Sequence, residues 1–179
     1  MRFAIIRVFL DLFTLYYSFN PTKKHQFFQL LVLSGPYHES FIHDIRRLTY
    51  AKKMAGRLHN CSIQIIFSGY DKITPVIKTK TAAIFDKKFS FQVCNLGPAD
   101  KVNTKIQLNY HRLHNQNFRG QVIVISDWWH LPRIKYYLNI FNLSSWNVYS
   151  EFNFFQFPSV ISEIVKIIKY SKMGDLEIR

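Results

Sequence analysis

The sequence predicts an α/β domain with a Rossmann-like, three-layer build and a mainly parallel sheet of about five strands. Short apolar runs rich in Val and Ile alternate along the chain with longer segments whose apolar residues recur at helical spacing. One such run, at 121–125, lies between Gly120 and the polar residues Ser126 and Asp127, which is typical of a strand buried on both faces. The length of 179 residues, with 48% hydrophobic and 20% charged residues, suits one globular domain.

The first 20 residues are predicted to stand apart from this domain, which then spans 21–179. The segment MRFAIIRVFLDLFTLYYSF is apolar, but Arg7 and Asp11 interrupt it and no small-residue cleavage site follows. Charges near the centre of a membrane span are costly. We therefore expect residues 1–20 to form an amphipathic helix that packs on the outside of the domain, with a membrane-surface role as the alternative.

The rest of the chain divides into alternating strands and helices. The predicted strands are 27–33, 62–67, 89–93, 121–125 and 146–149, and the predicted helices are 38–59, 74–85, 104–118, 131–142 and 159–170. The helix at 38–59 is expected to bury Ile42, and the helix at 104–118 to bury Ile106, Tyr110 and Leu113. The next helix should begin near Pro132, because proline is tolerated in a first helical turn.

Charge and cysteine content narrow the partners and the compartment. A net charge of +13 and a pI of about 9.8 favour anionic partners such as nucleotides, phosphorylated compounds, acidic lipid surfaces or nucleic acid. The Lys and Arg residues are spread along the whole chain, so general solvation explains them equally well and nucleic-acid binding rests on charge alone. Cys61 and Cys94 form neither a disulfide scaffold nor a short metal motif, which favours a reducing, cytoplasmic compartment.

Polar segments at the predicted strand and helix ends point to a ligand site. They are Ser34 with Gly35, Ser68 with Gly69, Asn103 with Thr104, and the stretch from Ser126 through Asp127 and His130 to Arg133. The carboxyl ends of parallel strands meet at one edge of a sheet, where open α/β sheets bind ligands. Glycines allow close approach of the backbone, helix N-termini favour phosphate or carboxylate, and an arginine can pair bidentately with either anion.

Several of these residues have two interpretations. His130 is predicted to act as a general acid or base or to contact an anion, the alternative being a histidine bonded to its own loop. Asp127 could orient His130, but capping of the next turn is the favoured role. Thr104, preceded by Asn103, is interpreted as a helix N-cap, and a ligand contact is the less favoured interpretation. Of the Trp128 and Trp129 rings, one should lie in the core and the other partly cover the site, with stacking on a base as the alternative.

The order of these motifs resembles the YdcF/SanA/ElyC family of bacterial α/β proteins. The matching stretches cover roughly residues 27–150 and read LVLSGP at 31–36, Arg47 and Leu48 with Ala51, IIFSGY at 65–70, NTKIQ at 103–107 and VIVISDWWHLPR at 122–133. The chain departs from the family pattern at the glycine positions Ser34, Pro36 and Tyr70. It also departs at Ile106 and Gln107, where a Glu-Asn pair is usual.

The resemblance implies a Rossmann-like fold and a nucleotide-sized ligand, with S-adenosylmethionine as the cofactor associated with the family and envelope biogenesis as a setting. An enzyme would then be a transferase or a phosphohydrolase acting on an envelope precursor. The missing acidic side chain at Ile106 favours the alternative of a non-catalytic binding module with a degenerate site. Thus the sequence leaves open whether the protein is an enzyme.

Other classes of site lack their motifs. His111 and His114 share a helix face, but a metal site needs further ligands and the sequence places none, so no metal is predicted. The chain has no G-x-S-x-G elbow, no P-loop motif and no G-x-G-x-x-G fingerprint. These absences disfavour a serine hydrolase of that type, a P-loop enzyme and a standard dinucleotide-binding domain.

Overall fold

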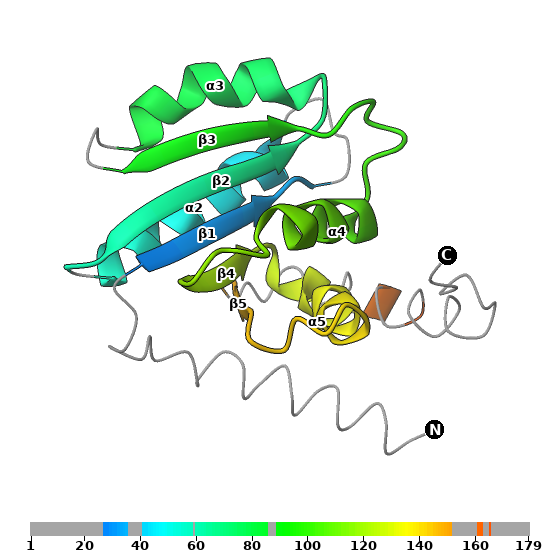
Figure 1. Cartoon of the computed structure of the whole chain (residues 1–179). Helices are drawn as coiled ribbons and strands as arrows, with labels where there is room; N and C mark the ends of the chain where they lie inside the picture. Colours follow the sequence, from blue (N-terminus) through cyan, green and yellow to red (C-terminus); the bar gives the residue numbers. More distant parts are fainter. Residues whose placement is uncertain are drawn as a thin grey trace.

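The computed structural model describes residues 27–35, 41–58, 60–85, 89–151, 161–162 and 165 (Figure 1). Its strands are β1 (Phe27–Leu33), β2 (Ser62–Gly69), β3 (Ser90–Asn95), β4 (Gln121–Ile125) and β5 (Asn147–Tyr149). Its helices are α2 (Ile42–Arg57), α3 (Ile73–Ile84), α4 (Thr104–His114) and α5 (Leu131–Ile140), with a short 3-10 turn η1 (Trp128–His130) before α5.

The five strands form one sheet in the order β3-β2-β1-β4-β5, and every neighbouring pair is parallel. The prediction of an α/β domain with a parallel five-stranded sheet is therefore confirmed. Strand order runs outward from β1 to β3 and then restarts on the other side of β1 with β4. The reversal between β1 and β4 is the place where open α/β sheets leave room for a ligand at their carboxyl edge.

Helices cover both faces of the sheet, because alternate residues of each strand point to opposite sides. Leu30 and Val32 of β1 pack with α2 and α3, while Leu31 and Leu33 pack with α4 and α5. Figure 1 shows the same arrangement, with α2 behind the sheet and α4 and α5 in front of it. The carboxyl end of β4 thus lies between the layer of α2 and α3 on one face of the sheet and the layer of α4 and α5 on the other.

The predicted phase of α4 is wrong. Ile106 and Leu113 are exposed, and the buried positions are Thr104, Gln107, Leu108 and His111. These four follow the i, i+3, i+4, i+7 spacing of one helix face. Three of them are polar, so a search for apolar residues alone selects the opposite face. Ile42, at the start of α2, is likewise exposed and not buried as expected.

The other helix and strand predictions hold to within a few residues, apart from α2 and α4, which are shorter than predicted. Residues 161, 162 and 165 are helical, as expected for 159–170, whereas the amphipathic helix predicted over 1–20 lies outside the described residues. Within the described ranges, none of the helices combines the length and the apolar character needed to cross a bilayer.

Candidate functional site

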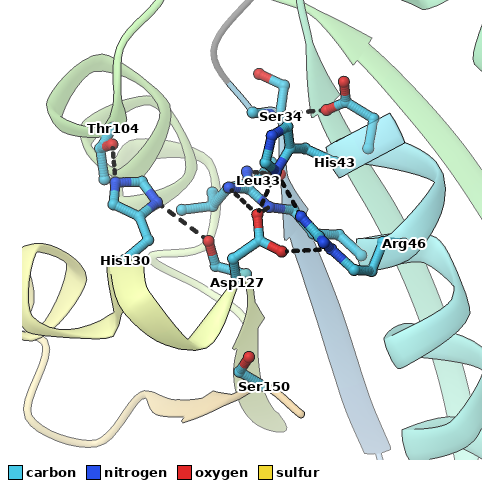
Figure 2. A network of polar contacts seen from close by, with 12 residues as sticks. Leu33, Ser34, His43, Arg46, Thr104, Asp127, His130 and Ser150 are labelled. Carbon is cyan, nitrogen blue, oxygen red and sulfur yellow. Dashed lines mark hydrogen bonds and ion pairs between the residues drawn. The ribbon is translucent and has the colours of Figure 1, made fainter. Parts of the chain in front are cut away.

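The two residues that follow β4, Ser126 and Asp127, turn their side chains toward different parts of the structure. Figure 2 shows Asp127 beside His43 and Arg46, and His130 beside Thr104. Asp127 faces α2, where it meets His43, Arg46 and Arg47. Ser126 faces the other side, where it meets His130. Strand alternation alone explains this division. Two different polar networks therefore begin within one peptide unit, at the reversal point of the sheet.

The first network, which we call the Asp127 cluster, consists of Asp127, His43, Arg46 and Arg47. Arg46 Nε donates to Asp127 Oδ1 at 2.9 Å, and Arg47 Nε donates to Oδ2 at 3.0 Å. Burial alone would raise the pKa of Asp127, but the Arg47 guanidinium beside it holds that pKa well below the ordinary value of 3.8. Asp127 is therefore a permanent anion at physiological pH.

The two arginines of this cluster differ in exposure and in role. Arg47 is fully buried and also donates from Nη1 to the carbonyl oxygen of Leu33 at 2.9 Å, so it ties α2 to the ends of both β1 and β4. The Arg46 side chain is 25% exposed. Arg47 is thus an internal bridge, whereas the Arg46 side chain is partly exposed to solvent.

His43 completes the cluster through one ring nitrogen. Its Nδ1 lies 3.2 Å from Asp127 Oδ2 and 2.6 Å from Arg46 Nη2. A guanidinium only donates and a carboxylate only accepts. Without a proton Nδ1 accepts from Arg46, and with a proton it donates to Asp127. The tautomer of His43 therefore determines whether its Nδ1 is hydrogen-bonded to Arg46 or to Asp127.

The second network, which we call the His130 chain, consists of Ser126, His130 and Thr104. Ser126 Oγ lies 3.1 Å from His130 Nδ1, and Thr104 Oγ1 lies 3.0 Å from His130 Nε2. All three residues are buried. A neutral imidazole accepts a hydrogen bond at one ring nitrogen and donates one from the other. One of the two hydroxyls therefore donates a hydrogen bond to His130, and the other accepts a hydrogen bond from it.

The backbone amides after β1 are used within the protein. The Ser34 N–H donates to Ser68 O and to Gln107 Oε1, both at 2.9 Å, and the Gly35 N–H donates to Asp44 Oδ1 at 2.7 Å. Burial raises the pKa of Asp44. Ligand contact through these two amides, as the sequence predicts, would require displacement of protein partners. The Ser34 and Ser68 hydroxyls are buried, and neither has a partner among the described residues.

Packing accounts for the two predicted glycines. A Cβ on Gly35 would lie 3.0 Å from the Cβ of His43, because the first turn of α2 passes directly over it. A Cβ on Gly69 would lie 2.7 Å from the Phe67 ring. Both positions therefore need glycine for reasons that involve no ligand.

The remaining predicted residues fall at the same edge of the sheet. Asn103 is the N-cap of α4, since its Oδ1 accepts from the N–H of Ile106 at 3.0 Å. Thr104 is the first helical residue and does not cap. The capping role favoured for Asp127 is also wrong, because its side chain makes no cap bond and instead binds α2. Arg133 lies half-buried in the first turn of α5.

Sequence reasoning missed five residues of this site: His43, Asp44, Arg46, Arg47 and Gln107. The available signal was the string HDIRR at 43–47, which crowds four charged or ionisable residues into the first turns of the helix after β1. Such crowding at the amino end of a helix normally indicates a solvated surface. Three of these residues instead contact the Asp127 carboxylate, about 80 residues further along the chain, and Asp44 accepts from the Gly35 N–H.

No protein-family model, curated protein or solved structure matches this chain. The resemblance to the YdcF/SanA/ElyC family therefore stays a prediction. Within the described ranges, no three His, Cys, Asp or Glu side chains lie close enough together to hold a metal ion.

Proposed function

We propose that this protein binds a nucleotide-like or phosphorylated small molecule at the carboxyl edge of the sheet, between β1 and β4. The observation that carries the proposal is Arg46, whose side chain is partly exposed and whose guanidinium is held by Asp127 at the reversal point of the strand order. A guanidinium held in place in this way offers an anion the N–H groups that neither Asp127 nor His43 uses, with little further loss of side-chain freedom.

Other groups at this edge support an anionic ligand. The N-termini of α2, α4 and α5 all lie at the carboxyl ends of the strands, as the parallel topology requires, and each helix N-terminus is an end of positive partial charge. Arg133 lies in the first turn of α5. The compounds to be tested are nucleotides and isoprenoid phosphates, which are anions, and S-adenosylmethionine, which has a carboxylate but a net positive charge.

Thermal unfolding of the full chain with and without these compounds tests the proposal. A compound that binds only the folded protein adds roughly 2.7 kcal/mol at about 100 times its Kd. The stabilisation should fall to about half in Arg46→Ala and weaken less in Arg133→Ala. It should persist in Lys52→Gln, which removes an exposed charge from the same helix as Arg46. Failure of every compound to stabilise the wild-type protein would reject the proposal.

The His130 chain favours an enzyme as a second candidate. An imidazole between two hydroxyls can pass a proton from one side to the other, which suits a transferase or a phosphohydrolase. His130→Asn separates the two functions: an enzyme loses turnover and keeps its ligand, whereas a non-catalytic binding module has no turnover to lose. Nucleic-acid binding is supported by the net charge alone. If it were the function, oligonucleotides would bind with a steep dependence on salt concentration.

A further inference from the structure

Arg46, His43 and Trp129 form one continuous surface where the Asp127 cluster reaches solvent. The Arg46 guanidinium contacts the His43 ring, and the His43 ring meets Trp129 edge to face, with 6.1 Å between ring centroids and 79° between ring planes. All three residues are half-buried, and Trp129 also packs in part against the core cluster that contains the buried Trp128. We call Arg46, His43 and Trp129 the Trp129 patch.

Both ends of the patch are held by the two buried networks. Trp129 stacks on His130, with 5.4 Å between ring centroids and 30° between planes, and His130 is fixed by its two hydroxyl partners. Arg46 is fixed by Asp127. The patch is therefore a prearranged surface, and a ligand that binds it orders few additional side chains.

The patch offers two kinds of contact, an aromatic ring and a guanidinium, and one class of ligand has groups that match both. An indole offers a flat π surface on which an aromatic ring stacks, and a guanidinium pairs with phosphate oxygens. Resting on the proposed function, we propose that the ligand is a nucleotide, with its base stacked on Trp129 and its phosphates paired with Arg46. A phosphorylated compound without an aromatic ring uses only half of this surface.

Calorimetric titration of the full chain with ADP, pyrophosphate and adenosine tests the assignment. ADP should bind about tenfold more tightly than pyrophosphate, since stacking of a base on an aromatic side chain is worth a factor of roughly 5 to 150. Trp129→Leu should abolish the advantage of ADP and leave pyrophosphate binding unchanged, while Trp129→Phe keeps most of the advantage. Arg46→Gln should weaken ADP and pyrophosphate about tenfold and leave adenosine unaffected.

Tryptophan fluorescence gives an independent readout on the same variants. ADP should quench the emission of the wild-type protein and of Trp146→Phe, which changes a ring outside the patch, but not that of Trp129→Phe. Circular dichroism establishes that each variant is folded. If Trp129→Leu is not folded, the loss of quenching in Trp129→Phe still tests whether ADP lies on this ring.

The possible outcomes separate this inference from the proposed function. Equal binding of ADP and pyrophosphate, or an advantage of ADP that survives in Trp129→Leu, overturns the nucleotide assignment and leaves the anion site in place. Absence of binding by all three probes and by the other proposed ligands overturns both.

Discussion

The Asp127 cluster and the His130 chain start from adjacent residues that follow β4, and they are stabilised by different interactions. The cluster joins a buried carboxylate to two guanidinium groups, so each member depends on the charge of the others. The chain joins an imidazole to two hydroxyls and carries no fixed charge. A charged buried network is sensitive to the loss of one member, whereas a neutral one loses single hydrogen bonds. The two faces of one sheet edge should therefore respond very differently to substitution.

The largest effect is expected from Asp127→Asn. The substitution keeps the shape of the side chain but leaves Arg47 fully buried without its counter-charge. Removal of one partner from a buried ion pair costs about 3–5 kcal/mol, and we expect a loss of that size in the free energy of unfolding measured by urea denaturation. Asp100→Asn, at an exposed position, is the matched control. A loss below about 1 kcal/mol would show that the cluster is not a buried charge network.

Acid should affect the α4 side of the sheet before it affects the Asp127 cluster. Burial, and to a smaller extent His114, lowers the pKa of His111 from 6.5 to about 4. The folded state thus favours neutral His111, and its contribution is complete above pH 6.5 and is lost as the pH falls toward 4. The difference of roughly 2.5 pKa units corresponds to about 3 kcal/mol. Asp127 follows later, because its lowered pKa keeps it ionised and its contribution falls only below about pH 3.8.

Urea denaturation at pH 7 and pH 4 measures this difference. The wild-type protein should lose about 3 kcal/mol more between these two pH values than His111→Leu does. His114→Gln, on the exposed side of the same helix, should behave nearly as the wild type. An equal loss in His111→Leu and the wild type would mean that His111 is not the group that titrates.

A smaller effect is expected in the His130 chain. Thr104→Val removes one hydroxyl and keeps the shape of the side chain, so it should lower the free energy of unfolding by about 1 kcal/mol. Ser126→Ala should cost a similar amount. The double variant should differ from the sum of the two, because both hydroxyls share the ring of His130. A loss in Thr104→Val as large as that of Asp127→Asn would remove the distinction between the two networks.

The fold was predictable because its signals are local. The five strands are short apolar runs that end in polar residues, and the run at 121–125 matches β4 at both ends. The site was only partly predictable. Ser126, Asp127 and His130 follow β4 directly, so their placement at the carboxyl edge could be read from the order of strands and helices.

The partners of these residues could not be read in the same way. Arg47 reaches Asp127 across 80 positions, and Gln107 reaches Ser34 across 73. No local pattern marks such pairs. The buried face of α4 was missed for a related reason. Two of its polar residues, Thr104 and Gln107, bond to His130 of η1 and to Ser34 after β1, and apolar periodicity does not mark such contacts.

The smallest effect on stability should come from Ile106→Glu, which tests whether Ile106 lies on the exposed or on the buried face of α4. Ile106 is 42% exposed and lies in the first turn of the helix, where a negative charge is stabilising by about 0.3–1 kcal/mol. The net change in stability should therefore stay within about 0.5 kcal/mol. Leu108→Ala, at a fully buried position of the same helix, should cost about 2–5 kcal/mol. If Ile106 packed inward as the apolar pattern indicates, a buried glutamate would cost several kcal/mol, and Thr104 would then be turned away from His130.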